Sequence, residues 1–129
     1  MRFADTSFWV ALRYATDEHH QDAVQRWQAI DRPIVTTNHV VGETWTFCRR
    51  RLGHAVACQF LDAIQGSRRV TVQHVDDEME TEAWAWLRRH DERNYSFVDA
   101  TSFAMMRRLR IAEALAYDAD FAAAGFGNV

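Results

Sequence analysis

The sequence predicts a single α/β domain built around a mostly parallel β-sheet. Short apolar or β-branched segments alternate along the 129 residues with longer segments that carry apolar residues at helical spacing. No internal repeat or low-complexity linker divides the chain, and Pro33 is its only proline. A chain of this length can bury one sizeable core, so we expect residues 1–129 to form one domain.

The first half of the chain is expected to contain two strands, each followed by two helices. The strands cover residues 2–5, which are apolar up to Asp5, and residues 33–37, which are rich in β-branched side chains. Apolar residues recur every three or four positions in the segments between and after these strands. The expected helices cover residues 7–15, 19–30, 39–52 and 54–64.

The second half continues the alternation of strands and helices. Residues 69–75 alternate in polarity like a strand, and residues 76–90 read as a helix whose acidic first turn and basic last turn suit the helix dipole. Residues 95–98 precede an expected helix over residues 100–110. A short strand over residues 113–118 and a helical turn over residues 120–126 complete the pattern, and any strand beyond them must be very short.

The composition indicates an ordinary soluble protein. Hydrophobic residues make up 48% and charged residues 26%, and no apolar run is long enough to span a membrane. The N-terminus lacks the pattern of a secretory signal. Cys48 and Cys58 lie in expected helices without a CxxC motif, which is typical of buried, reduced thiols in a cytosolic protein. We therefore expect a cytoplasmic location.

Four acidic residues from four separate segments are expected to meet at one edge of the sheet. Asp5 ends the first strand and Asp118 ends the late strand. Asp99 begins a helix that packs on the sheet, and Glu43 lies on or beside the apolar face of another. Ligands of such sheets bind at the carboxyl ends of the strands. Close carboxylates repel one another unless a pKa rises or a cation binds, and oxygen ligands select Mg²⁺ or Mn²⁺.

Each of these acids also has a purely structural interpretation. Asp5 and Asp99 could be helix N-caps, although capping does not exclude metal binding. Glu43 could lie exposed at the edge of an apolar stripe, and Asp118 could belong to a turn. Asp120 competes with Asp118 for the position after the strand, and we interpret Asp120 as the cap of the last helical turn.

Four segments resemble a known family, in the expected order and at about the expected spacing: FADTSFWVAL, TTNHVVGETWT, SFVDATSFAMM and ALAYDADFAAAGF. Together they are similar to the PIN-domain ribonucleases, and most of all to the VapC-type toxins of prokaryotic toxin–antitoxin modules. The resemblance covers essentially the whole chain. It implies a three-layer α/β/α fold and Mg²⁺- or Mn²⁺-dependent cleavage of RNA by a metal-activated water, with 5′-phosphate and 3′-hydroxyl product ends. It also implies a cognate antitoxin and a homodimer.

The resemblance carries over to individual residues. It implies that the metal-binding and catalytic acids are Asp5, Glu43, Asp99 and Asp118. Ser7 stands where the family often places a hydroxyl that supports the first acid. One departure concerns the residue two positions before the fourth acid, where the family often has Thr or Ser and this chain has Ala116.

Two clusters of arginine could contact the RNA. All 15 basic residues are arginine, so any phosphate contact must use a guanidinium group, which can bind phosphate through two hydrogen bonds. Residues 49–51 follow Glu43 by two helical turns, and Arg107, Arg108 and Arg110 follow Asp99 in a similar way. Both clusters could equally be solvated helix ends that suit the helix dipole.

Other functional classes fit the sequence less well. A receiver-type phosphoacceptor domain needs a strand-end lysine, and this chain has none. Haloacid-dehalogenase-like phosphatases need a second aspartate where Ser7 stands. A non-catalytic binding module with a divalent-cation site remains the alternative, and metal-dependent cleavage of RNA by the purified protein separates it from the nuclease.

Overall fold

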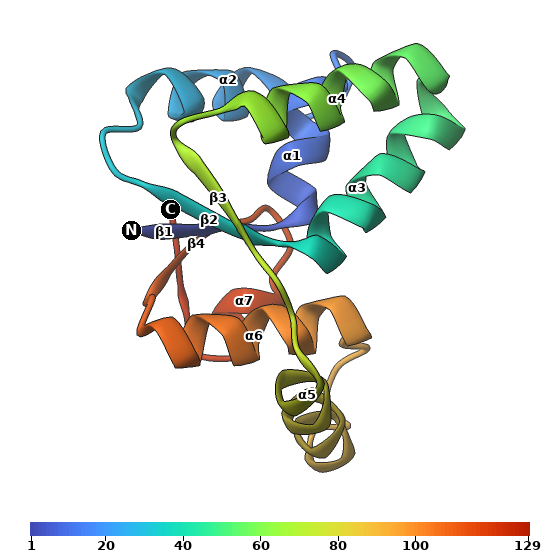
Figure 1. Ribbon diagram of the computed structural model, residues 1–129. Coiled ribbons are helices and arrows are strands. Elements are labelled where there is room, and N and C mark those ends of the chain that lie inside the picture. The colour runs from blue at the N-terminus through green and yellow to red at the C-terminus, as the bar shows by residue number, and fades with distance from the viewer.

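A five-stranded, all-parallel β-sheet forms the middle layer of the computed structural model, which describes residues 1–129 (Figure 1). The strands are β1 (Arg2–Ala4), β2 (Ile34–Thr37), β3 (Val70–Gln73), β4 (Glu113–Leu115) and β5 (Gly127–Asn128). Their order across the sheet is β3-β2-β1-β4-β5, and every neighbouring pair is parallel. The predicted α/β class and parallel sheet are confirmed.

Seven helices form the outer layers. They are α1 (Thr6–Arg13), α2 (His20–Ala29), α3 (Asn38–Arg51), α4 (His54–Gly66), α5 (Asp77–Arg89), α6 (Phe97–Leu109) and α7 (Asp120–Ala123). Helices α1 to α4 lie on one side of the sheet and α5 to α7 on the other (Figure 1). Parallel crossovers are right-handed, so the helices change sides where the chain reverses its direction across the sheet. That reversal leaves a switch point between β1 and β4, where ligands of such sheets bind.

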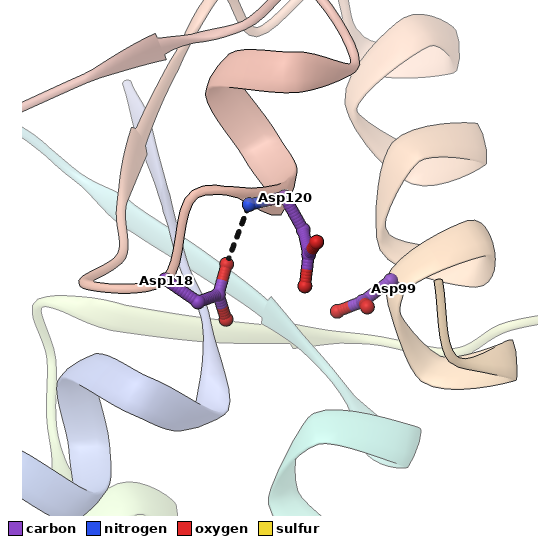
Figure 2. A group of neighbouring side chains, drawn as sticks. All are labelled: Asp99, Asp118 and Asp120. Atoms are coloured by element: carbon purple, nitrogen blue, oxygen red, sulfur yellow. Dashed lines mark hydrogen bonds between the residues drawn. The ribbon is translucent and has the colours of Figure 1, made fainter. Parts of the chain in front are cut away.

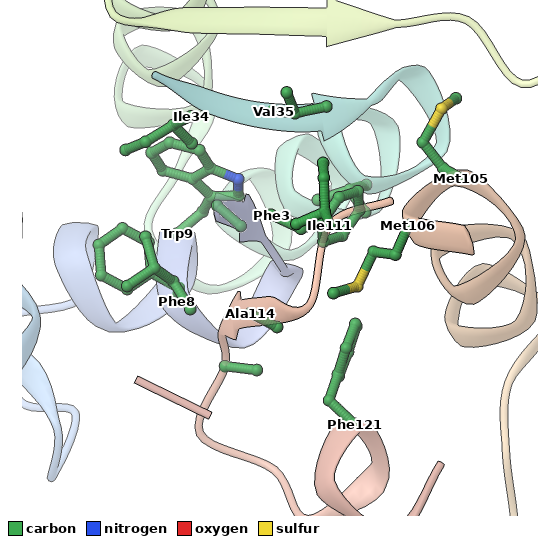
Figure 3. Packing of buried hydrophobic residues seen from close by; sticks show 14 of the residues in the cluster. Phe3, Phe8, Trp9, Ile34, Val35, Met105, Met106, Ile111, Ala114 and Phe121 are labelled. Atoms are coloured by element: carbon green, nitrogen blue, oxygen red, sulfur yellow. The ribbon is translucent and has the colours of Figure 1, made fainter. Parts of the chain in front are cut away.

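The core fills both spaces between the sheet and the helices. Figure 3 shows Trp9 of α1 on one side, and Met106 of α6 and Phe121 of α7 on the other, packed around the strands. Phe3 of β1, Met106 and Phe121 are fully buried. Burial of a side chain of this size contributes about 1.5–3 kcal/mol. Packing on both faces of the sheet therefore stabilises the strands and the position of their carboxyl ends.

Two boundaries differ from the sequence prediction near that edge. Helix α6 begins at Phe97, with Ser96 as its N-cap, so Phe97 and Val98 belong to the helix instead of preceding it. The reason is a capping box, in which Ser96 and Asp99 bond each other's backbone N–H groups. Strand β4 ends at Leu115, so Asp118 follows the strand by three residues instead of ending it.

The two cysteines are free thiols, as expected, but only Cys48 is buried, and Cys58 is partly exposed beside His54. None of the seven helices combines the length and apolar character needed to cross a bilayer.

Candidate metal centre

The switch point between β1 and β4 brings the predicted acids to one place. β1 and β4 pair in parallel, with Phe3 opposite Ala114 and Ala4 opposite Leu115, so the residues that follow both strands emerge at the same edge. A hollow of about 340 Å³ opens there. Its lining includes all four predicted acids: Asp5, Glu43, Asp99 and Asp118.

Three carboxylates form the tightest group in this hollow. Asp99 points from α6 toward Asp118 and Asp120, which lie beyond β4 (Figure 2), and one oxygen from each residue lies within 4.8 Å of the others. Oδ1 of Asp118 also accepts a 3.1 Å hydrogen bond from the backbone N–H of Asp120. Three negative groups at this separation repel one another strongly unless protons or a cation intervene.

The interpretation of Asp120 as a helix cap is wrong. The N-cap of α7 is Ala119, which has no side-chain acceptor, and Asp120 is the first residue of the helix. The carboxylate of Asp120 instead accepts a 2.9 Å hydrogen bond from Nε of Arg93 and joins the acidic group. The Asp118-x-Asp120 spacing shortly after a strand is the sequence feature that could have identified this residue.

Asp5 is the most deeply buried of the acids, with 2% of its surface exposed. Its Oδ2 accepts hydrogen bonds from the hydroxyl of Ser7 (2.9 Å) and from the backbone N–H of Ser7 (3.3 Å), so Asp5 is the N-cap of α1. Burial raises the pKa of Asp5 to about 8; the charges of Asp118 and Asp99 add to that rise, and the Ser7 hydrogen bonds oppose it.

Asp99 is also buried, with 8% of its surface exposed, and it stabilises the start of α6. It is the third residue of the helix, not the N-cap, and its Oδ2 accepts a 3.0 Å hydrogen bond from the backbone N–H of Ser96. Burial raises the pKa of Asp99 to about 6, and nearby Asp118 and Asp120 reinforce the rise against the Ser96 hydrogen bond.

Glu43 lies apart from the three close carboxylates. It is exposed on α3, while its neighbour Thr44 is buried, so Glu43 lies at the edge of the packed face of its helix. It lines the acidic hollow and also a second hollow beside it. Glu43 is therefore a residue of the rim.

The unpaired oxygens of the site fit a hard divalent cation. Asp5, Asp99 and Asp118 each keep one carboxylate oxygen that accepts no hydrogen bond from the protein. No arginine or histidine forms an ion pair with any of these three, whereas Asp120 is paired with Arg93. Several carboxylate oxygens without a protein cation form the ligand set that Mg²⁺ or Mn²⁺ prefers.

Ser7 occupies the supporting position that the family resemblance implies. Its Oγ donates to Asp5 and accepts a 2.9 Å hydrogen bond from the backbone N–H of Tyr117, next to Asp118. Ala116, the departure from the family pattern, is buried and offers no side-chain hydrogen bond. The segment after β4 is therefore held through its backbone.

An aromatic wall of the hollow was not predicted from the sequence. The rings of His19 and Tyr117 stack at 4.3 Å with an interplanar angle of 5°, and both line the hollow. The hydroxyl of Tyr117 donates a 2.6 Å hydrogen bond to Asp22, and burial, together with this bond, raises the pKa of Tyr117. These contacts join residues that are nearly a hundred positions apart, so no local sequence pattern predicts them.

Known proteins match this chain over nearly its whole length. The PIN domain matches residues 2–127. The 23S rRNA-specific endonuclease VapC20 of Mycobacterium tuberculosis is 53% identical over 129 residues in strain CDC 1551 / Oshkosh and equally so in strain H37Rv; the alignments cover 100% of this chain and 98% of each relative.

Solved structures show the same relationship. The crystal structure of M. tuberculosis VapC20, described as a toxin that cleaves the sarcin–ricin loop, superimposes with a TM-score of 0.96 at 51% identity, and the match covers 100% of this chain and 98% of that one. A toxin–antitoxin complex from Klebsiella pneumoniae matches with a TM-score of 0.70 at 15% identity over 100% of this chain and 96% of that one, which shows a shared fold. The predicted family resemblance is confirmed.

Proposed function

The chain belongs to the PIN-domain family, and from that premise we propose that it is a Mg²⁺- or Mn²⁺-dependent endoribonuclease that cleaves the sarcin–ricin loop of 23S ribosomal RNA. The observation that carries the proposal is the set of three acids at the switch point, Asp5, Asp99 and Asp118, each of which has a free carboxylate oxygen and no ion pair with a basic residue. The named activity of the relatives, which align over the whole chain, supports the choice of substrate.

Asp5, Asp99 and Asp118 would hold the cation, with Glu43 contributing from the rim of the hollow. A divalent cation at such a site lowers the pKa of a water molecule and offsets negative charge on the phosphate that is attacked. The proposed chemistry needs no nucleophilic side chain; the hydroxyl of Ser7, which lines the hollow, is bonded to Asp5 and to the backbone N–H of Tyr117 and not to a histidine that could activate it.

The surrounding residues hold the acids in place. Ser7 orients Asp5 through two hydrogen bonds, and Ser96 fixes Asp99 through the capping box. Arg93 partly neutralises Asp120, which reduces repulsion among the three close carboxylates. The stacked rings of His19 and Tyr117 form part of the wall of the hollow.

A cleavage assay tests the proposal. An RNA hairpin with the sarcin–ricin sequence is incubated with the purified chain in the presence of Mg²⁺, Mn²⁺ or EDTA. We expect one cut in the loop with either cation and none with EDTA. Asp118→Asn should lower the rate at least a hundredfold, on the scale of removing one electrostatic interaction with the transition state.

A matched variant makes the assay specific. Asp62→Asn removes the same charge from an exposed position on α4 that lines no hollow near the acids, and it should cleave like the parent. A cation-binding protein that leaves this hairpin, intact 23S RNA and transfer RNA uncut would be a binding module, and the nuclease proposal would fail.

The proposal extends to two protein partners. VapC-type proteins are toxins paired with antitoxins, so we propose that a cognate antitoxin binds and inhibits this chain, and that the chain forms a homodimer. Co-expression with the product of the neighbouring reading frame should yield a complex that no longer cuts RNA. Light scattering of the purified chain should give twice its mass of 15.0 kDa, and a monomer at micromolar concentration would contradict the homodimer.

A further inference from the structure

The two arginine clusters have different surroundings in the fold. Arg107 pairs with Glu82 at 3.2 Å, and Arg108 pairs with Asp76 at 3.1 Å, so both guanidinium groups are engaged with acids of the α5 region. Arg50 and Arg51 form no ion pair and no hydrogen bond with the protein. These two side chains are free to bind an external anion.

Arg50 and Arg51 also share a face of α3 with Glu43. Positions 43, 47 and 50 are spaced by four and three residues, which places them along one side of the helix. Arg51 borders this side and lines the same hollow as these three residues. At 1.5 Å per residue, Arg50 lies about 10 Å along the helix from Glu43. Glu43 and the two arginines therefore lie at opposite ends of one stripe on α3, which consists of residues 43, 47, 50 and 51.

This stripe lines a second hollow that adjoins the acidic one. The second hollow has a volume of about 610 Å³, with Arg50 and Arg51 in its lining, and it shares Glu43 and Phe47 with the acidic hollow. The guanidinium of Arg51 lies over the ring of Phe47, 5.7 Å from its centroid. The two hollows are therefore neighbours on the surface of the protein, and they meet at Glu43 and Phe47.

We propose that Arg50 and Arg51 bind a backbone phosphate of the RNA beside the one that is cleaved, so that the second hollow guides the strand into the acidic hollow. This inference rests on the proposed function. The chain carries a net charge of −3 and gathers acids at its centre, so an RNA strand needs a local source of positive charge to approach. Two guanidinium groups that line the same hollow supply that charge, and each has the geometry to bind phosphate through two hydrogen bonds.

A binding measurement without cleavage tests the inference. The probe is a fluorescein-labelled sarcin–ricin hairpin, and the binding constant is measured by fluorescence polarisation in EDTA over a series of salt concentrations. The variants are R50Q/R51Q and, as a control with the same change in charge, R107Q/R108Q. Thermal unfolding of each variant confirms that it is folded.

We expect R50Q/R51Q to weaken binding at least tenfold at low salt and to reduce the salt slope by about 0.7 for each phosphate that the variant no longer binds. R107Q/R108Q should change the binding constant less than threefold and leave the slope unchanged. Equal decreases in affinity in the two variants, or binding by R50Q/R51Q that matches the parent, would overturn the inference.

Cleavage by the parent in Mg²⁺, measured on the same hairpin, separates this inference from the proposed function. A parent that binds the hairpin through Arg50 and Arg51 without cutting it supports the inference and refutes the nuclease assignment for this RNA. A parent that cuts the hairpin while R50Q/R51Q binds it normally refutes the inference alone. A parent that fails to bind the hairpin overturns the inference as well.

Discussion

The hydroxyl of Ser7 accepts a 2.9 Å hydrogen bond from the backbone N–H of Tyr117, 110 residues further along the chain. The same hydroxyl donates to Asp5, so one small side chain joins the first acid to the segment that carries Asp118. The sheet brings β1 and β4 together only as neighbouring strands. Ser7 adds a side-chain link between the two segments that follow these strands, one of which begins with Asp5 and the other of which contains Asp118.

Ser7→Ala should therefore lower stability and activity together. It removes a hydrogen bond to a buried carboxylate and leaves the N–H of Tyr117 without a partner, which should lower the free energy of unfolding by about 1–3 kcal/mol. Urea unfolding at pH 7 measures the change. Ser67→Ala, which removes an exposed acceptor of the Arg69 N–H, should cost less than about 0.5 kcal/mol. Equal decreases in the free energy of unfolding for the two variants would show that the hydrogen bonds of Ser7 contribute no more than an exposed one.

Asp99→Asn separates capping from catalysis. An asparagine oxygen can still accept the hydrogen bond from Ser96, so the capping box and the fold should survive. Loss of the buried charge should leave the free energy of unfolding unchanged or higher, while RNA cleavage falls at least a hundredfold. Both quantities are measured on the same purified variant.

The control for this variant is Asp76→Asn, which changes the N-cap of α5 away from the hollow and should leave cleavage unaffected. If Asp99→Asn cut RNA as fast as its parent, Asp99 would serve only the start of α6.

Without a divalent cation, stability should fall as the pH rises. Folding raises the pKa of Asp5 from 3.8 to about 8 and the pKa of Asp99 from 3.8 to about 6. At a pH between the unfolded and folded pKa of either residue, the folded state therefore binds more protons than the unfolded state. The free energy of unfolding then decreases with pH across the window from about 4 to about 8. Melting temperatures at pH 5, 6.5 and 8 in EDTA should show this fall, and Asp5→Asn should remove most of it above pH 6.

Mg²⁺ should reverse that loss. A cation that binds only the folded state stabilises it by about 2.7 kcal/mol at a concentration 100 times its dissociation constant. The gain in melting temperature should be larger at pH 8 than at pH 5, because protons compete for the same carboxylates. Asp118→Asn should abolish the gain and Asp62→Asn should retain it. If the melting temperature of the parent does not change when Mg²⁺ or Mn²⁺ is added, the result would argue against the metal site.

Local patterns were sufficient to predict the layout of the fold. Helical spacing of apolar residues and β-branched segments located the main strands and helices, because each element buries one face in the core. The boundary at α6 was misplaced because the apolar pair Phe97 and Val98 read as a separate segment, whereas the reciprocal bonds of Ser96 and Asp99 start the helix earlier.

The site was predicted in part for a related reason. Asp5 and Asp118 follow strands that a parallel sheet must bring to one edge, so their convergence could be inferred from chain order. The place of Asp120 depends on Arg93 in a distant loop, and the stack of Tyr117 on His19 depends on how α2 packs. Such contacts depend on tertiary structure, and the periodicity of apolar residues along the chain does not predict them.

Gly42 offers a further test of the hollow beside the acids, because it is an exposed glycine inside α3 that lines this hollow and a Cβ built on it meets no atom within 4 Å. Gly42→Ala should raise the free energy of unfolding by about 0.5–1 kcal/mol, since alanine suits a helix interior better than glycine.

A longer side chain at position 42 should fill the space that the RNA strand is proposed to occupy. Gly42→Gln should therefore weaken binding of the hairpin severalfold in EDTA without loss of stability. Gly66→Gln, at an equally open position at the end of α4, should bind like the parent. Normal binding by a folded Gly42→Gln would mean that the strand passes elsewhere.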